Sequence, residues 1–436
     1  MKNFKKGFIA FLSFILIGFL CNILAFLIPN SMIHQNIMES SHVLQQEGPF
    51  FPVIGEKYRN SIADNNTDAL MLLMEDFSGE YNIVEKGLGG FYKTYNNTSN
   101  TGAYFFDMYI SSMQENAEET VTYSYSRYWH GWLLPLRLLL IFFSYEDIRV
   151  LSMAVLLLLL IYSSHILYNK NLKFYAIAYI ASCLFILPVT ASISFEYAFI
   201  YYIILIHNIF MMKHYDFITQ KLGFGVYFLI LGCCVSYFDF LTYPIASLGF
   251  CMTTYLLLSI CTEKRYYFTY IKDVILYSLA WGVGYLGMWI SKWIIGGIFL
   301  GNTVWQDALN QVAIRTSSTS SLGELNTEDK ISYIDTLVNN LSVFHTKGYL
   351  TIAILFFLFF LYWFLKSNGF KALKCHWKFS LPFMLIFAMP FAWTVIFKNH
   401  LYIHYNFTSN IFVVSILAIL GFLSLILSID TEIRIK

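Results

Sequence analysis

The sequence predicts an all-α polytopic membrane protein, and three observations lead to this fold class. Of its 436 residues, 57% are hydrophobic and only 13% are charged. The apolar residues form many long runs, and a helix that crosses a bilayer needs about 20 consecutive apolar residues. The polar residues are concentrated in one long stretch, residues 30–128, directly after the first apolar run. We therefore expect about 10 to 11 transmembrane helices and a large first extracytoplasmic loop.

The segments follow one another in a simple order. Residues 1–29 hold a basic start, MKNFKK, and an apolar run at 7–28 that is too long for a signal peptide and has no small-residue cleavage site. We expect this segment to be a retained signal anchor. The later candidate spans are residues 129–143, 148–168, 173–190, 195–212, 223–238, 242–261, 273–295, 349–366, 379–397 and 407–428. They divide into a helical core at 129–300 and C-terminal helices at 347–436, with a second outer loop at 301–346.

Lys and Arg in short loops mark the cytoplasmic side of a membrane protein. The segments rich in them are residues 1–6, 169–173, 213–221, 262–272, 367–378 and 432–436. The connections that then face outward are 30–128, 191–197, 236–244, 301–346 and 398–406. Eleven full crossings would separate the two ends, so one span should not cross. Residues 129–143 form the weakest span, and we expect a partly inserted helix there.

Composition also limits the kinds of partner and metal site that we expect. The net charge is +1 and the basic residues form no stripe, which argues against nucleic acid. None of the seven cysteines lies in the long loop, and no pair has metal or redox spacing, so we expect no disulfide and no structural metal.

Abundant Ile, Phe, Tyr, Asn and Lys are typical of an AT-rich bacterium, whose plasma membrane is the expected location. In the second loop, a Ser, Thr and Gly stretch predicts a linker or a flap before a helix over about 327–344.

Two carboxylates stand out in the first loop. Asp64 and Asp68 are four residues apart and share one face if this stretch is helical. Such a pair can act as general base, orient an acceptor hydroxyl or hold a divalent cation. Asp64 and Thr67 also precede an apolar run as a helix N-cap would, so Asp64 can cap while Asp68 acts.

A second group lies where the long loop re-enters the membrane: Arg127, Tyr128, Trp129, His130 and Arg137. The planar fork of Arg suits a phosphate or diphosphate. Interfacial anchoring is the alternative, and it explains Tyr128 and Trp129 well. It explains Arg137 poorly, because Arg137 lies inside the apolar run.

Four further residues complete the candidates on the outer side. Glu196 and Asp239 occupy outward turns between spans, where an acid can face a cavity and bind a sugar or cation, or can cap a helix. His400 and His404 share a face if their segment is helical. The segment lacks the Glu of a zinc peptidase motif, so we favour contact with a phosphate or hydroxyl over zinc, and ordinary interfacial packing is the other alternative.

With these residues in view, the chain resembles the GT-C class of integral membrane glycosyltransferases. The resemblance lies in the first helix, the large acidic loop after it, the re-entry segment YWHGWLLPLRLLLIFFSYEDIRVLS and the many following helices. It implies transfer of a sugar from a polyprenyl phosphate or diphosphate donor to a hydroxyl acceptor at the outer face, in cell-surface glycan synthesis. Asp64 or Asp68 best matches the acid that this class places near its reaction centre. Arg127 and Arg137 would then bind the phosphate, with His400 or His404 closing the site.

Three alternatives stay open on the sequence. An O-antigen-type polymerase or ligase usually has its large loop late in the chain, whereas here the largest loop comes first. A transporter or flippase for lipid-linked sugars would show internal repeats and paired broken helices, and none is visible. A non-catalytic scaffold is supported by the lack of a sharp motif. The charge rule further predicts that the outward candidates border one shared cavity.

Overall fold

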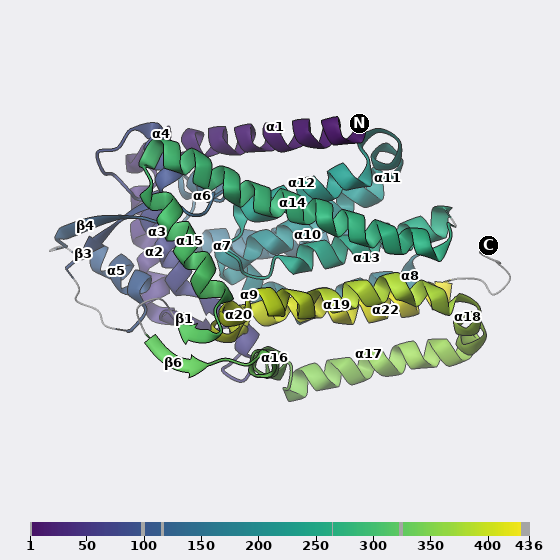
Figure 1. The fold of residues 1–436 in the computed structure, drawn as a ribbon. Coiled ribbons are helices and arrows are strands. Elements are labelled where there is room, and N and C mark those ends of the chain that lie inside the picture. Colours follow the sequence, from purple (N-terminus) through teal and green to yellow (C-terminus); the bar gives the residue numbers. More distant parts are fainter. Residues whose placement is uncertain (1, 97–100, 115–116, 264, 322–325, 429–436) are drawn as a thin grey trace.

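Helices dominate the computed structural model, which describes residues 2–96, 101–114, 117–263, 265–321 and 326–428 (Figure 1). In these residues, eight helical segments are long and apolar enough to cross a membrane, and a bent pair makes a ninth if it is one span. The eight are Phe4–Ala25, Tyr145–Asn169, Phe195–Lys213, Ile245–Glu263, Tyr267–Leu300, Lys347–Lys366, Gly369–Ile396 and Tyr405–Ser428. The chain is therefore an all-α membrane protein, with fewer full-length spans than expected.

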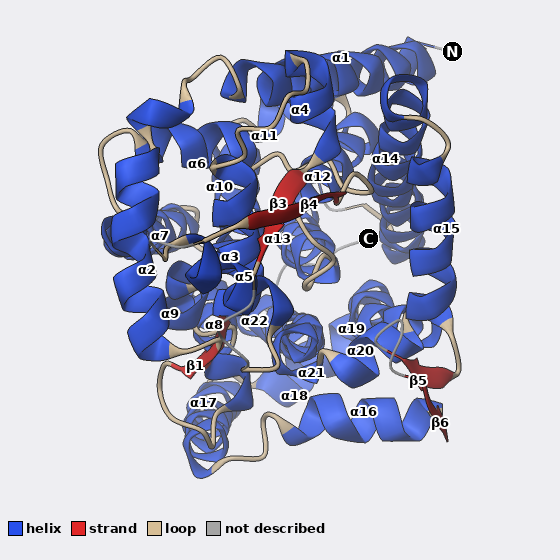
Figure 2. Cartoon of the chain, turned by 90° about the vertical axis from the view of Figure 1, so that its left-hand side faces the viewer, coloured by secondary structure: helices blue, strands red, loops and turns tan. Residues whose placement is uncertain are grey.

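The spans correspond to helices that are labelled in Figure 1, except for the short α21, which is labelled in Figure 2. In chain order they are α1 (Lys2–Ala25), α7 (Tyr145–Asn169), α10 (Phe195–Lys213), α13 (Ile245–Glu263), α14 (Tyr267–Leu300), α17 (Lys347–Lys366), α18 (Gly369–His376) with α19 (Ser380–Ile396), and α21 (Tyr405–Thr408) with α22 (Val413–Ser428). Short 3-10 turns at Trp377–Phe379 and Ser409–Phe412 join the last two pairs. The bent pair is α11 (Tyr215–Phe217), which continues as a π turn at Ile218–Leu222, and α12 (Phe224–Phe238), with 106° between them.

Two expected spans are shorter in the structure than in the sequence pattern. The run 129–143 holds only the eight-residue α6 (Leu133–Leu140), about 12 Å long, which is too short to cross. The run 173–190 is interrupted after α8 (Lys173–Phe185), and a new helix, α9 (Pro188–Ile193), follows. Pro188 has no N–H for a continuing helix, and Leu187 before it takes φ 57°, so the chain turns here. These two breaks account for most of the difference in number.

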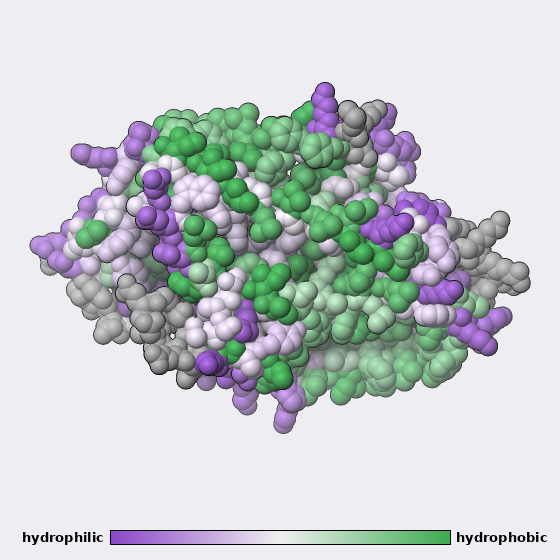
Figure 3. All heavy atoms as spheres, viewed as in Figure 1, coloured by the Kyte–Doolittle hydropathy of each residue, from purple (hydrophilic) through white to green (hydrophobic). Residues whose placement is uncertain are grey.

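The connecting segments fall at two opposite ends of the helices. The long first loop, α9, α15, α16 and α20 lie at one end, and the start of α1, α11 and α18 lie at the other (Figure 1). This is the division that the positions of Lys and Arg predict. Between the ends, Figure 3 shows mainly apolar surface, with hydrophilic side chains gathered towards both ends. We call the end that carries the first loop the loop end.

The loop end has its own small elements, which Figure 2 shows face on. The first loop contains a 3-10 turn at Asn30–Met32, α2 (His34–Glu47), β1 (Phe50–Pro52), a 3-10 turn at Arg59–Ser61, β2 (Ile62–Asp64), α3 (Asn65–Glu75), α4 (Ile83–Gly89), β3 (Phe91–Tyr95), α5 (Tyr104–Ser112) and β4 (Glu119–Ser124). Later segments add α15 (Thr303–Thr316), β5 (Thr319–Ser321), β6 (Asn326–Lys330), α16 (Tyr333–Ser342) and α20 (Lys398–Ile403). The strands pair antiparallel as β1–β2, β3–β4 and β5–β6. In the second loop, the helix expected at 327–344 is α16 alone, preceded by β6.

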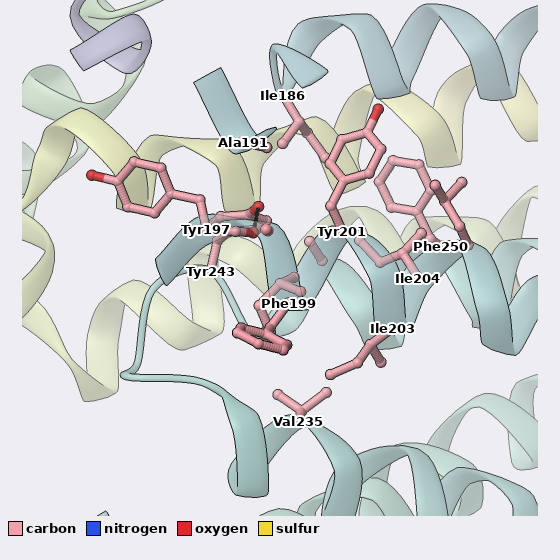
Figure 4. Close-up of a cluster of buried hydrophobic side chains, with 14 of the residues drawn as sticks. Ile186, Ala191, Tyr197, Phe199, Tyr201, Ile203, Ile204, Val235, Tyr243 and Phe250 are labelled. Atoms are coloured by element: carbon pink, nitrogen blue, oxygen red, sulfur yellow. Dashed lines mark hydrogen bonds between the residues drawn. The ribbon is translucent and has the colours of Figure 1, made fainter. Parts of the chain in front are cut away.

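Close helix contacts hold the apolar part together. Helices α12 and α14 approach so closely that a Cβ at Gly232 or Gly284 would lie 2.1 Å from a carbonyl oxygen of the other helix. Small residues at helix interfaces permit this kind of approach in membranes. Around α10, Figure 4 shows a buried cluster in which Tyr243 lies next to Tyr197, and the Tyr243 hydroxyl donates to the Tyr197 carbonyl at 2.7 Å. This core fixes the first turn of α10 at the loop end.

Candidate active site

Four acidic residues from four separate segments meet at the loop end. Asp64 ends β2, Asp68 lies in the first turn of α3, Glu196 lies in the first turn of α10, and Asp239 follows α12. Glu196 interacts electrostatically with the other three. We call Asp64, Asp68, Glu196 and Asp239 the carboxylate group. The sequence placed all four on the same face, and the structure brings them together.

Asp64 and Asp68 both cap helices. The Asp64 carboxylate accepts from the Thr67 N–H at 2.9 Å and from the Thr67 hydroxyl at 3.0 Å, so Asp64 is the N-cap of α3. Asp68, which is fully buried, accepts from the backbone N–H groups of Phe195 at 3.3 Å and Glu196 at 3.2 Å. These two N–H groups open α10, where a negative charge is stabilised. The capping alternative is thus confirmed for Asp64, and Asp68 caps a helix far away in sequence.

Asp239 is occupied in a similar way. Its two carboxylate oxygens accept from the N–H of Leu241 at 3.0 Å and the N–H of Thr242 at 3.0 and 3.1 Å, and the Thr242 hydroxyl also donates to it. This ring of bonds closes the turn after α12, where Leu241 takes φ 72°. Asp239 therefore shapes the turn and brings a buried charge to the carboxylate group.

Glu196 differs from its neighbours. The side chain is 4% exposed, and its Oε2 atom has no hydrogen-bond partner among the residues that the structure describes. The Thr67 hydroxyl donates to Asp64 and also interacts with the Glu196 carboxyl group, so Thr67 lies between these two acids. An unpartnered buried carboxylate oxygen is costly and is typical of functional positions. Asp64, the only half-exposed member of the group, lies on its open side.

Burial sets the protonation of the group. It raises the pKa of Asp68 to about 7, against the lowering effect of the nearby Arg149 and of hydrogen bonds from Tyr145 and the Glu196 backbone. Burial likewise raises the pKa of Asp239 to about 6, and it raises the pKa of Asp64. Carboxyls with pKa values this near neutrality can exchange protons at physiological pH.

Two further arginines, Arg127 and Arg315, lie at the same end of the protein, on or against α15. Arg127 is held by Asp307 of α15, with Nη1 at 2.9 and 3.1 Å from the carboxylate oxygens, and it lies over the ring of Tyr125 at 3.8 Å. Arg315, at the end of α15, lies 6.0 Å from the ring centre of Tyr128. The Nε atom of each arginine is buried and has no partner in the described part of the chain. A cavity of about 20 Å³ lies between them, lined also by Tyr128, Trp289, Trp293, Ala308, Gln311 and Val312.

His400 connects Arg315 to the turn that carries Asp239. Its Nε2 lies 2.7 Å from the Leu241 carbonyl oxygen, to which it donates, and its Nδ1 accepts from Arg315 Nη1 at 2.9 Å. The rings of His400 and His404 are 4.8 Å apart, which confirms their expected proximity. Burial and Arg315 lower the pKa of both, that of His404 to about 3, so both are neutral. His400 therefore positions Arg315 against the turn that Asp239 closes.

Arg137 does not join this site. Its side chain is 1% exposed, and all its nitrogens are engaged by the protein. The Nε and Nη2 atoms donate to the Ile28 carbonyl at 3.1 and 3.0 Å, Nη1 contacts Glu75 Oε2 at 3.2 Å, and Nη2 also donates to Asn30. The expected phosphate contact is replaced by a protein carboxylate, because the end of α3 lies against α6. We therefore correct the sequence interpretation of Arg137 to a structural role.

The aromatic members of the re-entry segment are buried. Tyr128 packs against Phe240 and Trp289 beside the arginines, whereas the Trp129 indole donates to the Met288 carbonyl at 2.7 Å on α14. Both ring nitrogens of His130 are buried without a described partner, and burial lowers its pKa well below the usual value. Trp129 is thus part of the packing and Tyr128 is part of the site.

The predicted shared cavity is only partly present. Arg127 and Tyr128 line the small cavity described above, but no member of the carboxylate group lines it. Among the described residues, no group of three or more His, Cys, Asp or Glu side chains is arranged to hold a metal ion.

Sequence reasoning missed Arg315 and Arg149, and it named Thr67 only as part of a helix cap. Arg315 had a usable signal, because it is the only basic residue between 301 and 329 on the outer face. In comparisons with known proteins, no family model, no curated protein and no solved structure matches this chain.

Proposed function

We propose that this chain is a membrane glycosyltransferase that moves a sugar from a polyprenyl phosphate or diphosphate to a hydroxyl acceptor at the loop end. The observation that carries the proposal is a free buried carboxylate oxygen, on Glu196, at the same end of the protein as two arginines whose Nε atoms are unpartnered among the described residues. The resemblance to the GT-C class supports the same reading. A bacterial plasma membrane and a cell-surface glycan product belong to the proposal.

Glu196 and Asp64 take the general-base role. The acceptor oxygen attacks the anomeric carbon, the bond between that carbon and the phosphate oxygen breaks, the polyprenyl phosphate leaves, and the acceptor proton passes to Glu196 in its ionised form. Asp64, linked to Glu196 by Thr67, orients the acceptor from the half-exposed side. General-base catalysis of this kind contributes about 10²- to 10⁴-fold. Asp68 is a positioning residue, because it fixes the helix turn that carries Glu196.

Arg127 and Arg315 stabilise the leaving phosphate. Their guanidinium groups are planar forks that match phosphate oxygens, and fixed charges of this kind stabilise a developing anion most strongly in a dry site. His400 holds Arg315 and keeps it on the side of Asp239. A divalent cation is not needed for this scheme.

A transporter of lipid-linked sugars is less well supported. Transporters place their broken helices at the substrate site. Here the bent pair α11–α12 lies at the end opposite the carboxylate group, and the break at Pro188, at the loop end, belongs to no internal repeat visible in the sequence (Figure 1).

The test is a transfer assay on purified protein with a polyprenyl-phosphate sugar and a panel of acceptors. Glu196→Gln should lower kcat by about 100-fold or more, because the amide cannot take the proton. Arg315→Lys should raise the KM for the donor, because an ammonium lacks the planar fork. Glu56→Gln, on an exposed acid of the same loop, is the control and should behave as wild type. Full transfer by Glu196→Gln would defeat the proposal.

A further inference from the structure

Helix α16, in the second loop, has polar side chains on its inner side and apolar side chains on its outer side. Thr336 and Asn340 are fully buried, whereas Ile334, Val338 and Leu341 are 68%, 59% and 44% exposed. A helix on the surface of a soluble protein normally buries its apolar stripe and exposes its polar residues. The three exposed apolar residues are spaced by four and three positions, so they form one stripe along the helix. This arrangement suits a helix whose outer side meets an apolar environment.

Polar contacts fix the inner side of α16. Asn340 Nδ2 donates to the Leu401 carbonyl of α20 at 2.8 Å, and the Thr408 hydroxyl donates to Asn340 Oδ1 at 2.9 Å. The Tyr333 hydroxyl donates to the Phe391 carbonyl of α19 at 3.2 Å. These bonds set the rotation of α16 about its axis, and the apolar stripe stays on the outside.

A third side of α16 is polar and exposed. Asp335 and Ser342 are exposed, and Asn339 is half-buried. At 3.6 residues per turn, these three residues lie between the apolar stripe and the buried Asn340. The helix thus has one side for the protein, one for water and one for an apolar environment. A helix that lies in the plane of a membrane interface needs the last two of these sides.

The level of α16 along the membrane-spanning helices agrees with such a position. Helix α16 ends at Ser342, and the spanning helix α17 begins at Lys347. The 20 residues of α17 are about 30 Å long, which is the thickness of the hydrocarbon core, so the core ends near Lys347. In Figure 1 α17 runs lengthwise and α16 is seen end-on, and Figure 2 shows α16 lengthwise along one edge of the loop end. Helix α16 therefore runs across the direction of α17 at the level where the hydrocarbon core ends.

We infer that α16 is an interfacial helix whose stripe of Ile334, Val338 and Leu341 lies among the lipids at the loop end of the membrane. The bilayer is the occupant because the stripe lies at the level of the interface and follows directly on α17, most of whose surface is also exposed and apolar. The second loop is then held to the membrane. Because α16 is bonded to α20, this contact also supports the helix that carries His400.

The experiment measures the depth of nitroxide labels on the full chain in liposomes of phosphatidylcholine and phosphatidylglycerol. Val338→Cys places a label on the stripe, and Asn339→Cys places it about 100° around the helix, on the polar side. The exposed Cys261 and Cys375 are first replaced by Ser, and this parent protein gives the background signal. Leu355→Cys, at a 61% exposed position of α17, provides the reference for the lipid core.

The readout is the ratio of collisions with oxygen, which dissolves in lipid, to collisions with a water-soluble nickel chelate. This ratio should be several-fold higher for Val338→Cys than for Asn339→Cys, with the stripe about 5–10 Å into the boundary between head groups and acyl chains. Equal ratios at the two positions would overturn the inference. Spin–spin broadening of the Val338→Cys label that grows with the protein-to-lipid ratio would place a second copy on the stripe and would also overturn it. If Val338→Cys does not fold, Ile334→Cys and Leu341→Cys report on the same stripe.

Discussion

The buried pair of Arg137 and Glu75 gives the sharpest test of the structure. Side chains of both residues are at most 1% exposed, and the Arg137 guanidinium bridges α6, α3 and the segment after α1. Breaking a buried pair by removing one partner costs roughly 3–5 kcal/mol, because the other charge is left uncompensated. Glu75 has no spare partner, since its Oε1 atom is already unpaired among the described residues. Arg137→Met should therefore lower the free energy of unfolding in detergent by about this amount.

A double-mutant cycle separates the pair from its surroundings. Glu75→Leu combined with Arg137→Met removes both charges, so it should recover a large part of the loss of either single variant. Arg59→Met is the matched control, because Arg59 is an exposed arginine of the same loop and its change should cost less than about 1 kcal/mol. The assay is denaturant unfolding followed by tryptophan fluorescence.

One result would refute this reasoning. If Arg137→Met keeps the stability of the Arg59→Met control but loses binding of polyprenyl phosphate, Arg137 acts on the ligand. The structural role assigned to it would then be wrong.

Two further predictions concern stability. The folded pKa of Asp68 is about 7 against an ordinary 3.8, so between about pH 4 and pH 7 the folded state binds more protons and stability should fall as pH rises. In Asp68→Asn, the unfolding midpoint should fall less steeply with pH than in the wild type. The fall should not vanish, because burial also raises the pKa values of Asp64, Asp239 and Glu75. An unchanged slope of the midpoint against pH would contradict the prediction. Gly284→Ala should destabilise by about 1–3 kcal/mol, because its Cβ would meet the Leu229 carbonyl at 2.1 Å. Gly282→Ala, with open space around it on the same helix, should be nearly neutral, and equal unfolding midpoints for the two would argue against the α12–α14 contact.

The spans were predictable because hydropathy is a local property. The boundaries of α7 and α10 lie within a few residues of the predicted ones, and α7 starts early because Ser144 and Asp147 form a capping box. The break at Pro188 was also visible in the sequence, but the apolar run around it concealed its effect. The short strands of the first loop were missed because strands of three to six residues carry almost no periodic signal.

The candidate site was predictable only in part, because partners lie far apart in the chain. Charge placement predicted that Asp64, Glu196, Asp239 and His400 share a face, and they do meet. It could not show that Asp68 caps α10, which starts 127 residues later. Nor could it show that Glu75 pairs with Arg137, 62 residues away, so that an arginine in an apolar run was mistaken for a ligand contact.

The hydrogen bonds made by the four acids of the carboxylate group differ, and the difference bears on which acid takes part in the proposed reaction. Gathering four acids in a buried place is unfavourable, and the fold offsets this by giving three of them backbone N–H donors: Asp64 at α3, Asp68 at α10 and Asp239 at its own turn. Glu196 alone keeps an oxygen without a partner. These donors satisfy the other three acids of the group, whereas Glu196 keeps a buried oxygen that no described residue satisfies. The unsatisfied oxygen therefore identifies Glu196, rather than Asp68, as the acid whose replacement should stop a reaction without loosening the fold.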